Sequence, residues 1–440
     1  MLSRLPFIKR SRGFTLHIQL SLADFLDKCF AAIKEGKVLA KKLKKKIGEE
    51  TDDIAKSELI KELDGVQMHL FAHKNVARIA KYVVDGIAWR RLNYDRPIIR
   101  LLSSNKRAIS IDVKEPGLRG VLNVARGITT RHKSYVIIND LTNFIRIGDL
   151  TEIHKKAIYI HECKQKGKLV RNIFTLLRDL RKIKNISKQT EQLLTAQTAI
   201  THRKIIVNDK LTVQIEDLDV PFYSHLRAVK SVISKTRRKG YYSKSLASYL
   251  FVTCLDLKKA AKQTKVVEWK RSPLPVQWNQ KDFIVPFTNT DTFYKNEDAF
   301  IPNWTPYSIF PFSAKSCMAL LSGNIVLTAL LNLTKLYEFL GDNGWEVDGA
   351  NEEDLVSRYD ASMPLVPNPG IAYQYDETLC ILKRGAFRLA LPATLVFRIG
   401  MDFLSPKTIL LEAEKLFNDA VPLKEDILAI NLTQEKRVWN

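Results

Sequence analysis

Three side chains that could hold a divalent cation and a reacting water lie within a short stretch of this 440-residue chain: Asp149, Glu162 and Lys164. Two carboxylates can bind one divalent cation between them, and a lysine beside them can hold an attacking water or a developing negative charge. This combination is typical of metal-assisted chemistry on a substrate that develops negative charge. It requires a fold that brings the three side chains to one place.

The elements that would position these side chains form a predicted β-hairpin. Residues 144–153 and 157–163 are rich in apolar side chains, and a short polar turn at 155–156 separates them. If the turn is centred between its two lysines, Asp149 lies directly opposite Glu162. Side chains alternate between the faces of a strand, so the two acids and the lysine that follows emerge on one face, beside isoleucines.

Two interpretations of the facing acids are open. Like charges directly opposite each other on two strands repel, so ordinary strand pairing selects against them, and a bound cation would offset the repulsion. The alternative is a solvated hairpin on which two acids happen to align. The agreement of spacing, facing and flanking apolar residues favours the cation site.

These residues resemble the PD-(D/E)XK phosphodiesterase superfamily, whose signature is an Asp on one strand of a hairpin and Glu-x-Lys on the next. Gly148-Asp149 is similar to the second motif of the family with Gly in place of Pro, and Glu162-Cys163-Lys164 is similar to the third. The resemblance implies a restriction-endonuclease-like core of a helix, three antiparallel strands, a second helix and a further strand. It also implies that Asp149 and Glu162 bind Mg²⁺ or Mn²⁺ and that Lys164 orients or activates the attacking water.

The family core often carries an acidic residue on its first helix, and Asp85 is the one acid in the helix expected at 67–92. The resemblance implies that Asp85 could complete the site, whereas a single acid on a helix is also typical of a surface or capping residue. The first strand is expected at 134–139, the second helix at 169–198 and the last strand at 204–207. The insert is expected to contain a strand at 107–113 and a short helix at 118–126.

Basic residues dominate the first part of the chain. The chain has 70 Lys and Arg against 47 Asp and Glu, and residues 1–250 hold 50 of these bases and 24 of these acids. Such a field attracts polyanions, usually nucleic acid, although an anionic membrane surface or simple solvation would also suit it. In the segment directly after Glu162-Cys163-Lys164, which includes the start of the expected second helix, bases would contact the phosphates of a bound strand. These are Lys166, Lys168, Arg171, Arg178, Arg181 and Lys182.

Length and composition predict a mixed α/β chain of the α+β kind in three parts. Residues 1–65 are expected to form helices that end near Asp64-Gly65. Residues 66–218 are expected to form the nuclease-like domain, and residues 219–440 an α+β accessory domain.

The accessory domain has a helical pattern at 222–263, followed at 273–312 by a segment rich in proline and aromatic residues. Such aromatics could stack unpaired bases, but they are more typical of packing in a loop-rich β module. Strands are expected at 378–383, 386–391 and 394–399, and a helix at 406–418.

The five cysteines are widely spaced and odd in number, which indicates a reducing compartment. The first residues lack the apolar core of a signal peptide, and no stretch approaches the roughly 20 apolar residues of a membrane span. We therefore expect a cytoplasmic protein with no membrane partner.

The expected function is a metal-dependent nuclease that cleaves DNA, by analogy in restriction or anti-phage defence. A second hypothesis is a nucleic-acid-binding protein that uses a nuclease-like fold without cleavage. A third is an assembly component whose C-terminal half binds another protein or a second copy of the chain. The sequence leaves open whether the substrate is DNA or RNA and whether cleavage is internal or terminal.

Overall fold

The computed structural model describes residues 12–163, 196–262, 275–289, 307–349 and 378–420, with gaps inside these ranges of which the longest is 103–115. The chain divides into two compact units. Residues 4–92 and 98–215 form the unit that we call the N-terminal unit, and the C-terminal unit comprises 1–3, 93–97 and 216–440. Residues 4–65, expected as a separate helical segment, thus belong to the unit that contains the hairpin.

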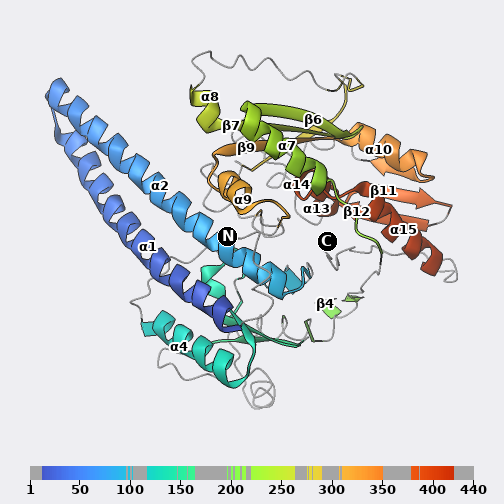
Figure 1. Ribbon diagram of the computed structural model, residues 1–440, viewed down its shortest axis with the longest axis horizontal. Coiled ribbons are helices and arrows are strands. Elements are labelled where there is room, and N and C mark those ends of the chain that lie inside the picture. Colours follow the sequence, from blue (N-terminus) through green and yellow to red (C-terminus); the bar gives the residue numbers. More distant parts are fainter. Residues whose placement is uncertain are drawn as a thin grey trace. The chain divides into compact units, whose positions relative to one another are not determined.

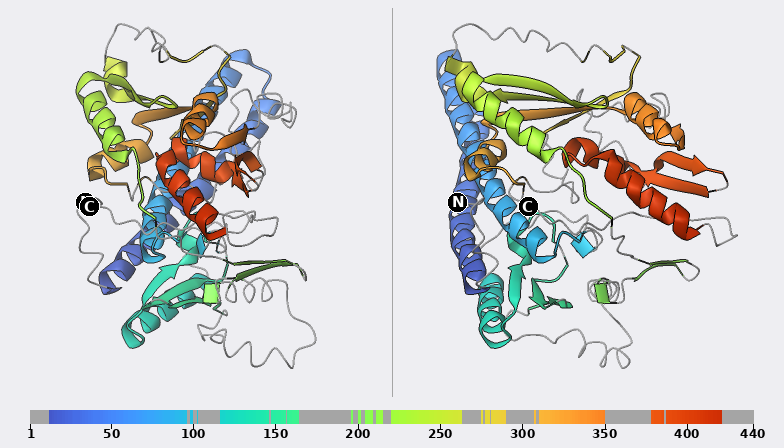
Figure 2. Two further views of the ribbon diagram at one scale, coloured as in Figure 1. Left: turned by 90° about the vertical axis from the view of Figure 1, so that its right-hand side faces the viewer. Right: turned by 45° about the vertical axis from the view of Figure 1, so that its right-hand side comes forward.

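Two long helices, α1 (Arg12–Glu49) and α2 (Asp53–Arg91), pack side by side as an antiparallel pair (Figures 1 and 2). Asp52 caps α2, because its carboxylate accepts hydrogen bonds from the backbone of the first turn. The helix end expected near Asp64-Gly65 is wrong, since α2 continues through both residues. A single glycine weakens a helix by only about 1 kcal/mol, and packing against α1 outweighs that cost.

The sheet of the N-terminal unit contains the expected hairpin. Its strands follow the order β1-β2-β3 and are all antiparallel. The helix expected in the insert is present as α4 (Pro116–Arg131), whereas the strand expected at 107–113 lies outside the described residues. The strands are β1 (Tyr135–Ile138), β2 (Leu150–His154) and β3 (Ala157–His161).

One face of this sheet packs against the helices in an apolar core. Val136, Ile138 and Leu150 meet buried side chains of α1, α2 and α4. Each large apolar side chain buried in this way contributes about 1.5–3 kcal/mol. Gln19 of α1 closes the free edge of β1, because its amide donates to the carbonyl of Val136 (2.8 Å) and accepts from the N–H of Ile138 (2.9 Å).

A separate two-stranded hairpin ends the described part of the N-terminal unit. It pairs β4 (Lys204–Asn208) with β5 (Leu211–Gln214). The strand expected at 204–207 is therefore confirmed.

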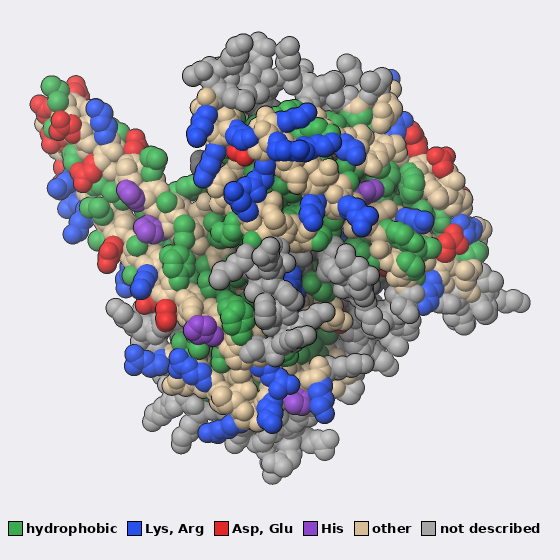
Figure 3. Space-filling view, viewed as in Figure 1, with side chains coloured by type: hydrophobic (Ala, Val, Ile, Leu, Met, Phe, Trp, Pro, Cys, Tyr) green, Lys and Arg blue, Asp and Glu red, His purple; other side chains and the backbone are tan. Residues whose placement is uncertain are grey.

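The C-terminal unit is built on a four-stranded antiparallel sheet with the order β6-β7-β9-β8. The helix α7 (Leu226–Lys239) packs against β6 and β7 through Leu226, Val229, Val232 and Ile233, all fully buried. Lys and Arg side chains gather over α7, β6 and α8 (Figure 3). These strands and the short helix are β6 (Tyr241–Ala247), β7 (Leu250–Asp256), β8 (Ile284–Thr288), β9 (Ile325–Asn332) and α8 (Leu257–Lys262).

The helical pattern expected over 222–263 is only partly correct, because β6 and β7 occupy its middle. Gly240, with φ 88°, ends α7 and starts the turn into β6. β7 is a central strand that pairs with β6 and β9, and this long-range pairing overrides local preference.

A second antiparallel sheet of the C-terminal unit has the order β10-β11-β12. The strands expected at 378–383 and 386–391 are confirmed, but 394–399 contains helical turns where a strand was expected. The strands are β10 (Glu346–Gly349), β11 (Thr378–Arg384) and β12 (Phe387–Pro392). The helices are α9 (Ala314–Leu321), α10 (Leu333–Asp342), α13 (Ala393–Val396), α14 (Arg398–Met401) and α15 (Pro406–Ala420).

The aromatic residues of 273–312 that the structure describes serve mainly as packing. Trp278, Phe287, Phe310 and Phe312 are all buried. The mixture of helices and antiparallel sheets places the protein in the α+β class. A search of the described helices finds none with the length and apolar character needed to span a membrane.

Candidate functional site

The predicted hairpin register is confirmed along the whole of the paired region. His154 pairs with Ala157, Thr151 with Ile160, and Leu150 with His161, all antiparallel. The turn begins at Lys155, whose φ of 52° is the left-handed conformation that tight hairpin turns require.

Asp149 and Glu162 lie immediately beyond the last facing pair, one on each strand. The N–H of Asp149 donates to the carbonyl oxygen of His161 (2.8 Å), and Leu150 also lies opposite His161. Two consecutive residues facing a single partner are typical of a β-bulge, which re-aims the side chains beside it. The direct facing of Asp149 and Glu162 is therefore not part of the observed register, although the two residues remain neighbours at this end of the hairpin.

Gly148 makes the turn into this region possible. Its φ is 68°, and a Cβ atom on this residue would lie 2.5 Å from Cγ2 of Ile160 and 2.9 Å from the carbonyl oxygen of His161. Proline is fixed near a φ of about −65° and cannot adopt this conformation. A proline at position 148 would therefore be incompatible with this backbone conformation.

Asn139 fixes the backbone in front of Asp149. Its side-chain amide donates to the carbonyls of Ile147 (2.9 Å) and Gly148 (3.1 Å), and its oxygen accepts from the hydroxyl of Thr151 (2.9 Å). Its own N–H donates to the carbonyl of Asp149 (3.0 Å). Sequence reasoning missed this residue, although the register of β1 on β2, extended by one residue, places Asn139 beside Asp149.

The carboxylate of Asp149 lies among negative charges. Burial is the largest effect on its pKa, and the charges of Asp140 and Glu162 add to it, so that the pKa rises to about 6. One hydrogen bond acts in the opposite direction, because the N–H of Cys163 donates to Oδ2 of Asp149 (2.5 Å). A nearby positive charge would stabilise the ionised form of Asp149.

Asp140 is a second acid that sequence reasoning missed as a site residue. It belongs to the short 3₁₀ helix η2 (Asn139–Leu141) that follows β1. Its negative charge raises the pKa of Asp149. The signal that could have identified it is its position directly after the first strand, at the same end of the sheet as the candidate acids.

Cys163 does not have the properties of a nucleophile. Burial, together with the charges of Asp149 and Glu162, raises the pKa of its thiol to about 12. Its side chain packs against the apolar core of the N-terminal unit. The thiol is therefore protonated at neutral pH.

Asp85 is buried on α2 and bonds to the loop that follows η2. Its Oδ1 accepts from the N–H of Asn143 (2.7 Å) and its Oδ2 from the side-chain amide of Asn143 (2.6 Å). Both carboxylate oxygens thus hold a loop that leads to Asp149. This arrangement supports a positioning role for Asp85.

Glu152 is a buried carboxylate of β2 with a different environment. His161 Nε2 lies 2.8 Å from its Oε2 and His132 Nδ1 lies 3.3 Å from its Oε1. Burial alone would raise its pKa, but hydrogen bonds from His161, Ser134 and His132, with the charge of His161, outweigh burial and lower the pKa to about 2.

Lys164 and the expected second helix lie outside the described residues, apart from Ala196 near its end. The same holds for the predicted phosphate-contacting bases. These are Lys166, Lys168, Arg171, Arg178, Arg181 and Lys182.

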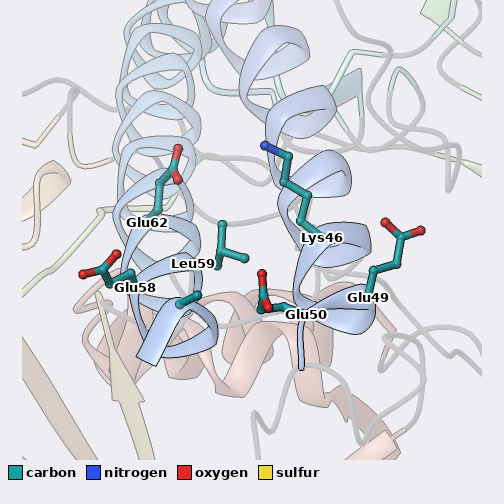
Figure 4. Close-up of a pocket in the computed structure, with 7 residues that line it drawn as sticks. Lys46, Glu49, Glu50, Glu58, Leu59 and Glu62 are labelled. Atoms are coloured by element: carbon teal, nitrogen blue, oxygen red, sulfur yellow. The ribbon is translucent and has the colours of Figure 1, made fainter. Parts of the chain in front are cut away.

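Within the described parts of the chain, no group of three or more His, Cys, Asp or Glu side chains has the arrangement of a metal site. Mg²⁺ is commonly held by only one or two protein carboxylates together with substrate phosphates and water, so the pair Asp149 and Glu162 fits its requirements. A pocket at the tip of the helical pair is lined by Glu49, Glu50, Glu58, Glu62 and Lys46 (Figure 4). These are surface acids around one lysine and do not form a candidate site.

Comparison with known proteins identifies no family for this chain. No protein-family model matches the chain. No curated protein and no solved structure matches it either.

Proposed function

We propose that this protein is a metal-dependent nuclease that hydrolyses phosphodiester bonds in DNA, with its site at the open end of the β2–β3 hairpin. The observation that carries the proposal is the position of Asp149 and Glu162 directly after the last facing pair, Leu150 and His161. The order of helices followed by three antiparallel strands is in keeping with the start of a restriction-endonuclease-like core, whereas the further strand, β4, pairs with β5 in a separate two-stranded sheet.

The electrostatics of Asp149 support a cation at this position. Its half-buried carboxylate has Asp140 and Glu162 as charged neighbours, and both raise its pKa. Without a counter-charge, ionising Asp149 at neutral pH costs free energy. Mg²⁺ or Mn²⁺ would remove that cost, whereas a solvated surface hairpin would not bury this acid.

Each residue has a defined role in the proposed reaction. Asp149 and Glu162 would hold the cation, which supplies Lewis-acid stabilisation of the phosphate and lowers the pKa of a bound water. Lys164, by the motif, would orient or activate the water. Asp85 would hold the loop through Asn143 and so fix Asp149 in place.

The negative charge of this site needs a basic surface to bring a polyanionic substrate to it. In the proposal, the bases between Lys166 and Lys182 contact the phosphates of the bound strand. Restriction or anti-phage defence is the biological setting that we propose by analogy.

The test is a cleavage assay of the full chain with plasmid, linear duplex and single-stranded DNA, and with RNA, each with Mg²⁺, Mn²⁺ or EDTA. Asp149→Asn, Glu162→Gln and Lys164→Ala should abolish or sharply reduce cleavage. Glu152→Gln is the matched control, because it changes a carboxylate of the same strand that already has hydrogen-bond partners in the fold. If wild-type protein cleaves and the three variants cleave equally well, the site lies elsewhere.

Binding without cleavage is the second candidate function. It is favoured by the charge of the chain, because residues 1–250 hold 50 bases against 24 acids and would attract nucleic acid whether or not it is cleaved. In that case no nucleic acid would be cut with any divalent ion, while wild type and Asp149→Asn would bind DNA with equal affinity. Binding of neither DNA nor RNA would instead favour an assembly component.

A further inference from the structure

The C-terminal unit carries a concentrated basic surface that the proposed hairpin site does not use. Between residues 226 and 262 the chain has ten Lys and Arg and a single acid, Asp256. Seven of the bases are exposed, and none forms an ion pair with an acid of the described residues. We call these seven the α7 basic face: Arg227, Lys230, Arg238, Lys239, Lys244, Lys258 and Lys262.

The helix α7 arranges part of this face in a straight stripe. Arg227, Lys230, Ser231, Ser234 and Arg238 follow the helical repeat and lie opposite the buried apolar residues. At 1.5 Å per residue the stripe is about 16 Å long, which matches about half a turn of duplex nucleic acid. The two serines between the bases add hydrogen-bond donors of the kind that contact phosphate oxygens.

The strand β6 extends the face beside the helix. Tyr242 contacts α7, since Lys235 Nζ lies 3.1 Å from its hydroxyl. Lys244 is two residues further along β6 and therefore emerges on the same face of the sheet. Lys235 Nζ and Lys239 Nζ lie 4.7 and 5.8 Å from the centre of the Tyr242 ring, and the hydrogen bond from Lys235, with the charges of Lys235, Lys244 and Lys239, lowers the pKa of its hydroxyl.

The helix α8 continues the face at the other end of α7. Lys259 of α8 donates to the carbonyl oxygen of Arg238 (2.7 Å) and ties the two helices together. Lys258 and Lys262 remain exposed on α8. The resulting concentration of Lys and Arg is visible over α7, β6 and α8 in Figure 3.

Helix stability alone does not explain this distribution of charge. Bases in the last turn of a helix are favourable, as at Arg238 and Lys239, but bases near its start oppose the helix dipole. Arg227 and Lys230 lie in the first turns of α7, and no acid accompanies them there. A solvated helix face would gain from an acid in these positions, so their charge points to a ligand.

We infer that the α7 basic face binds the phosphodiester backbone of nucleic acid, as a contact surface additional to the hairpin site. A membrane surface fits less well, because the apolar side chains of α7 are buried and Leu257 is the one large apolar side chain exposed between 226 and 262. The half-buried Tyr242 among the lysines fits nucleic acid, where aromatic side chains accompany basic ones. The inference extends the proposed function by adding a surface for its substrate, and its test does not depend on cleavage.

The test measures binding of the full chain to a labelled DNA duplex by fluorescence anisotropy, in EDTA and over a series of salt concentrations. The triple variant Arg227→Ala/Lys230→Ala/Lys244→Ala should bind about tenfold more weakly, and its salt slope should be shallower by about 2–3. The matched control, Lys281→Ala/Lys315→Ala/Lys415→Ala, removes the same charge from exposed or partly exposed positions of the same unit outside the face. Control affinity should remain within about twofold of wild type, since only non-specific charge is lost.

Two further arms define the ligand and separate the two proposals. An RNA duplex tests whether the shared phosphate backbone suffices, and vesicles of phosphatidylserine and phosphatidylcholine test the membrane alternative. Equal losses in both triple variants, an unchanged salt slope, or loss of vesicle binding without loss of DNA binding would overturn the inference. Because binding is measured in EDTA, where no cleavage occurs, failure of the hairpin site appears only in the cleavage assay.

Discussion

Two carboxylates of the same hairpin, the half-buried Asp149 at its open end and the buried Glu152 in the middle of β2, have opposite electrostatics. Asp149 lies just before β2, and its pKa rises to about 6. Glu152 lies three residues further along, and its pKa falls to about 2. Burial raises the pKa of both, so burial does not account for the difference.

The neighbours of each carboxylate account for it. Glu152 accepts hydrogen bonds from His161, Ser134 and His132, and its negative charge is stabilised within the fold. Asp149 has two further acids as charged neighbours and one backbone N–H as donor. A carboxylate with a structural role has hydrogen-bond donors within the fold that stabilise its charge. A carboxylate that lies near other acids is instead typical of a cation-binding site.

The largest expected effect is on catalysis. If the proposed nuclease site is correct, Asp149→Asn should lower cleavage at least about 100-fold, because the carboxylate that would hold the metal is lost and with it several kcal/mol of transition-state stabilisation. Glu152→Gln should leave cleavage by the folded fraction within a few fold of wild type. Initial rates with saturating Mg²⁺ test this pair, and equal losses in both variants would remove the distinction between the two carboxylates.

The next effect is on stability at neutral pH. Glu152→Gln should lower the free energy of unfolding by about 1.5–3 kcal/mol, because it replaces charge-assisted hydrogen bonds with neutral ones around buried donors. Urea denaturation at pH 7 measures the change. If the free energies of unfolding of the two proteins, extrapolated to zero urea, do not differ measurably, the contact between Glu152 and His161 contributes little to stability.

The lowered pKa of Glu152 also predicts how the stability of the protein changes with pH. The folded pKa of Glu152, about 2, lies below its ordinary value of 4.5. Its contribution is therefore fully present above pH 4.5 and is lost as the pH falls towards 2. Thermal melts of wild type and Glu152→Gln should converge over this window, and curves that stay parallel would contradict the assigned cause.

The bulge before Asp149 can be tested through its glycine. Gly148→Ala should destabilise the protein by about 1–3 kcal/mol, because a Cβ there is strained at positive φ and meets the backbone of β3. Gly65→Ala is the control, since Gly65 lies inside α2 with no atom within 4 Å of an added Cβ. That change should stabilise the protein by up to about 1 kcal/mol, and chemical denaturation of both variants measures the contrast.

The smallest expected effect concerns Asp149 itself. Its folded pKa of about 6 lies above the ordinary 3.8, so its contribution to stability is present below pH 3.8 and is lost as the pH rises through 6. At pH 8 without divalent cations, Asp149→Asn should therefore be more stable than wild type by about 1 kcal/mol. Added Mg²⁺ should stabilise wild type alone and so reduce the difference in stability between the two proteins. Differential scanning calorimetry measures this difference, and a difference that Mg²⁺ does not change would contradict the prediction.

Local pattern was sufficient for several elements. The alternation of apolar residues and the two-lysine turn determined the pairing from His154–Ala157 to Leu150–His161. The start of β1 and the helix α15 followed from similar signals. Short-range periodicity carries this information because each residue's face is set by its own strand or helix.

Long-range pairing and packing decided the other elements. β7 became a strand because β9, more than 60 residues later, pairs with it. The residues from 394 to 399, expected as a strand, form helical turns, and α2 passes through Gly65 because α1 packs along it.

The same division holds for the candidate site. The sequence by itself predicted that Asp149 and Glu162 would face each other on neighbouring strands, and the structure keeps them neighbours just beyond the last facing pair, Leu150 and His161. Only the tertiary structure revealed the bulge at Asp149, the charge of Asp140 beside it, and the hydrogen bond that commits Glu152 to His161. The reason is physical: strand periodicity fixes which residues are neighbours, whereas a carboxylate's charge state depends on groups that other segments of the chain bring to it.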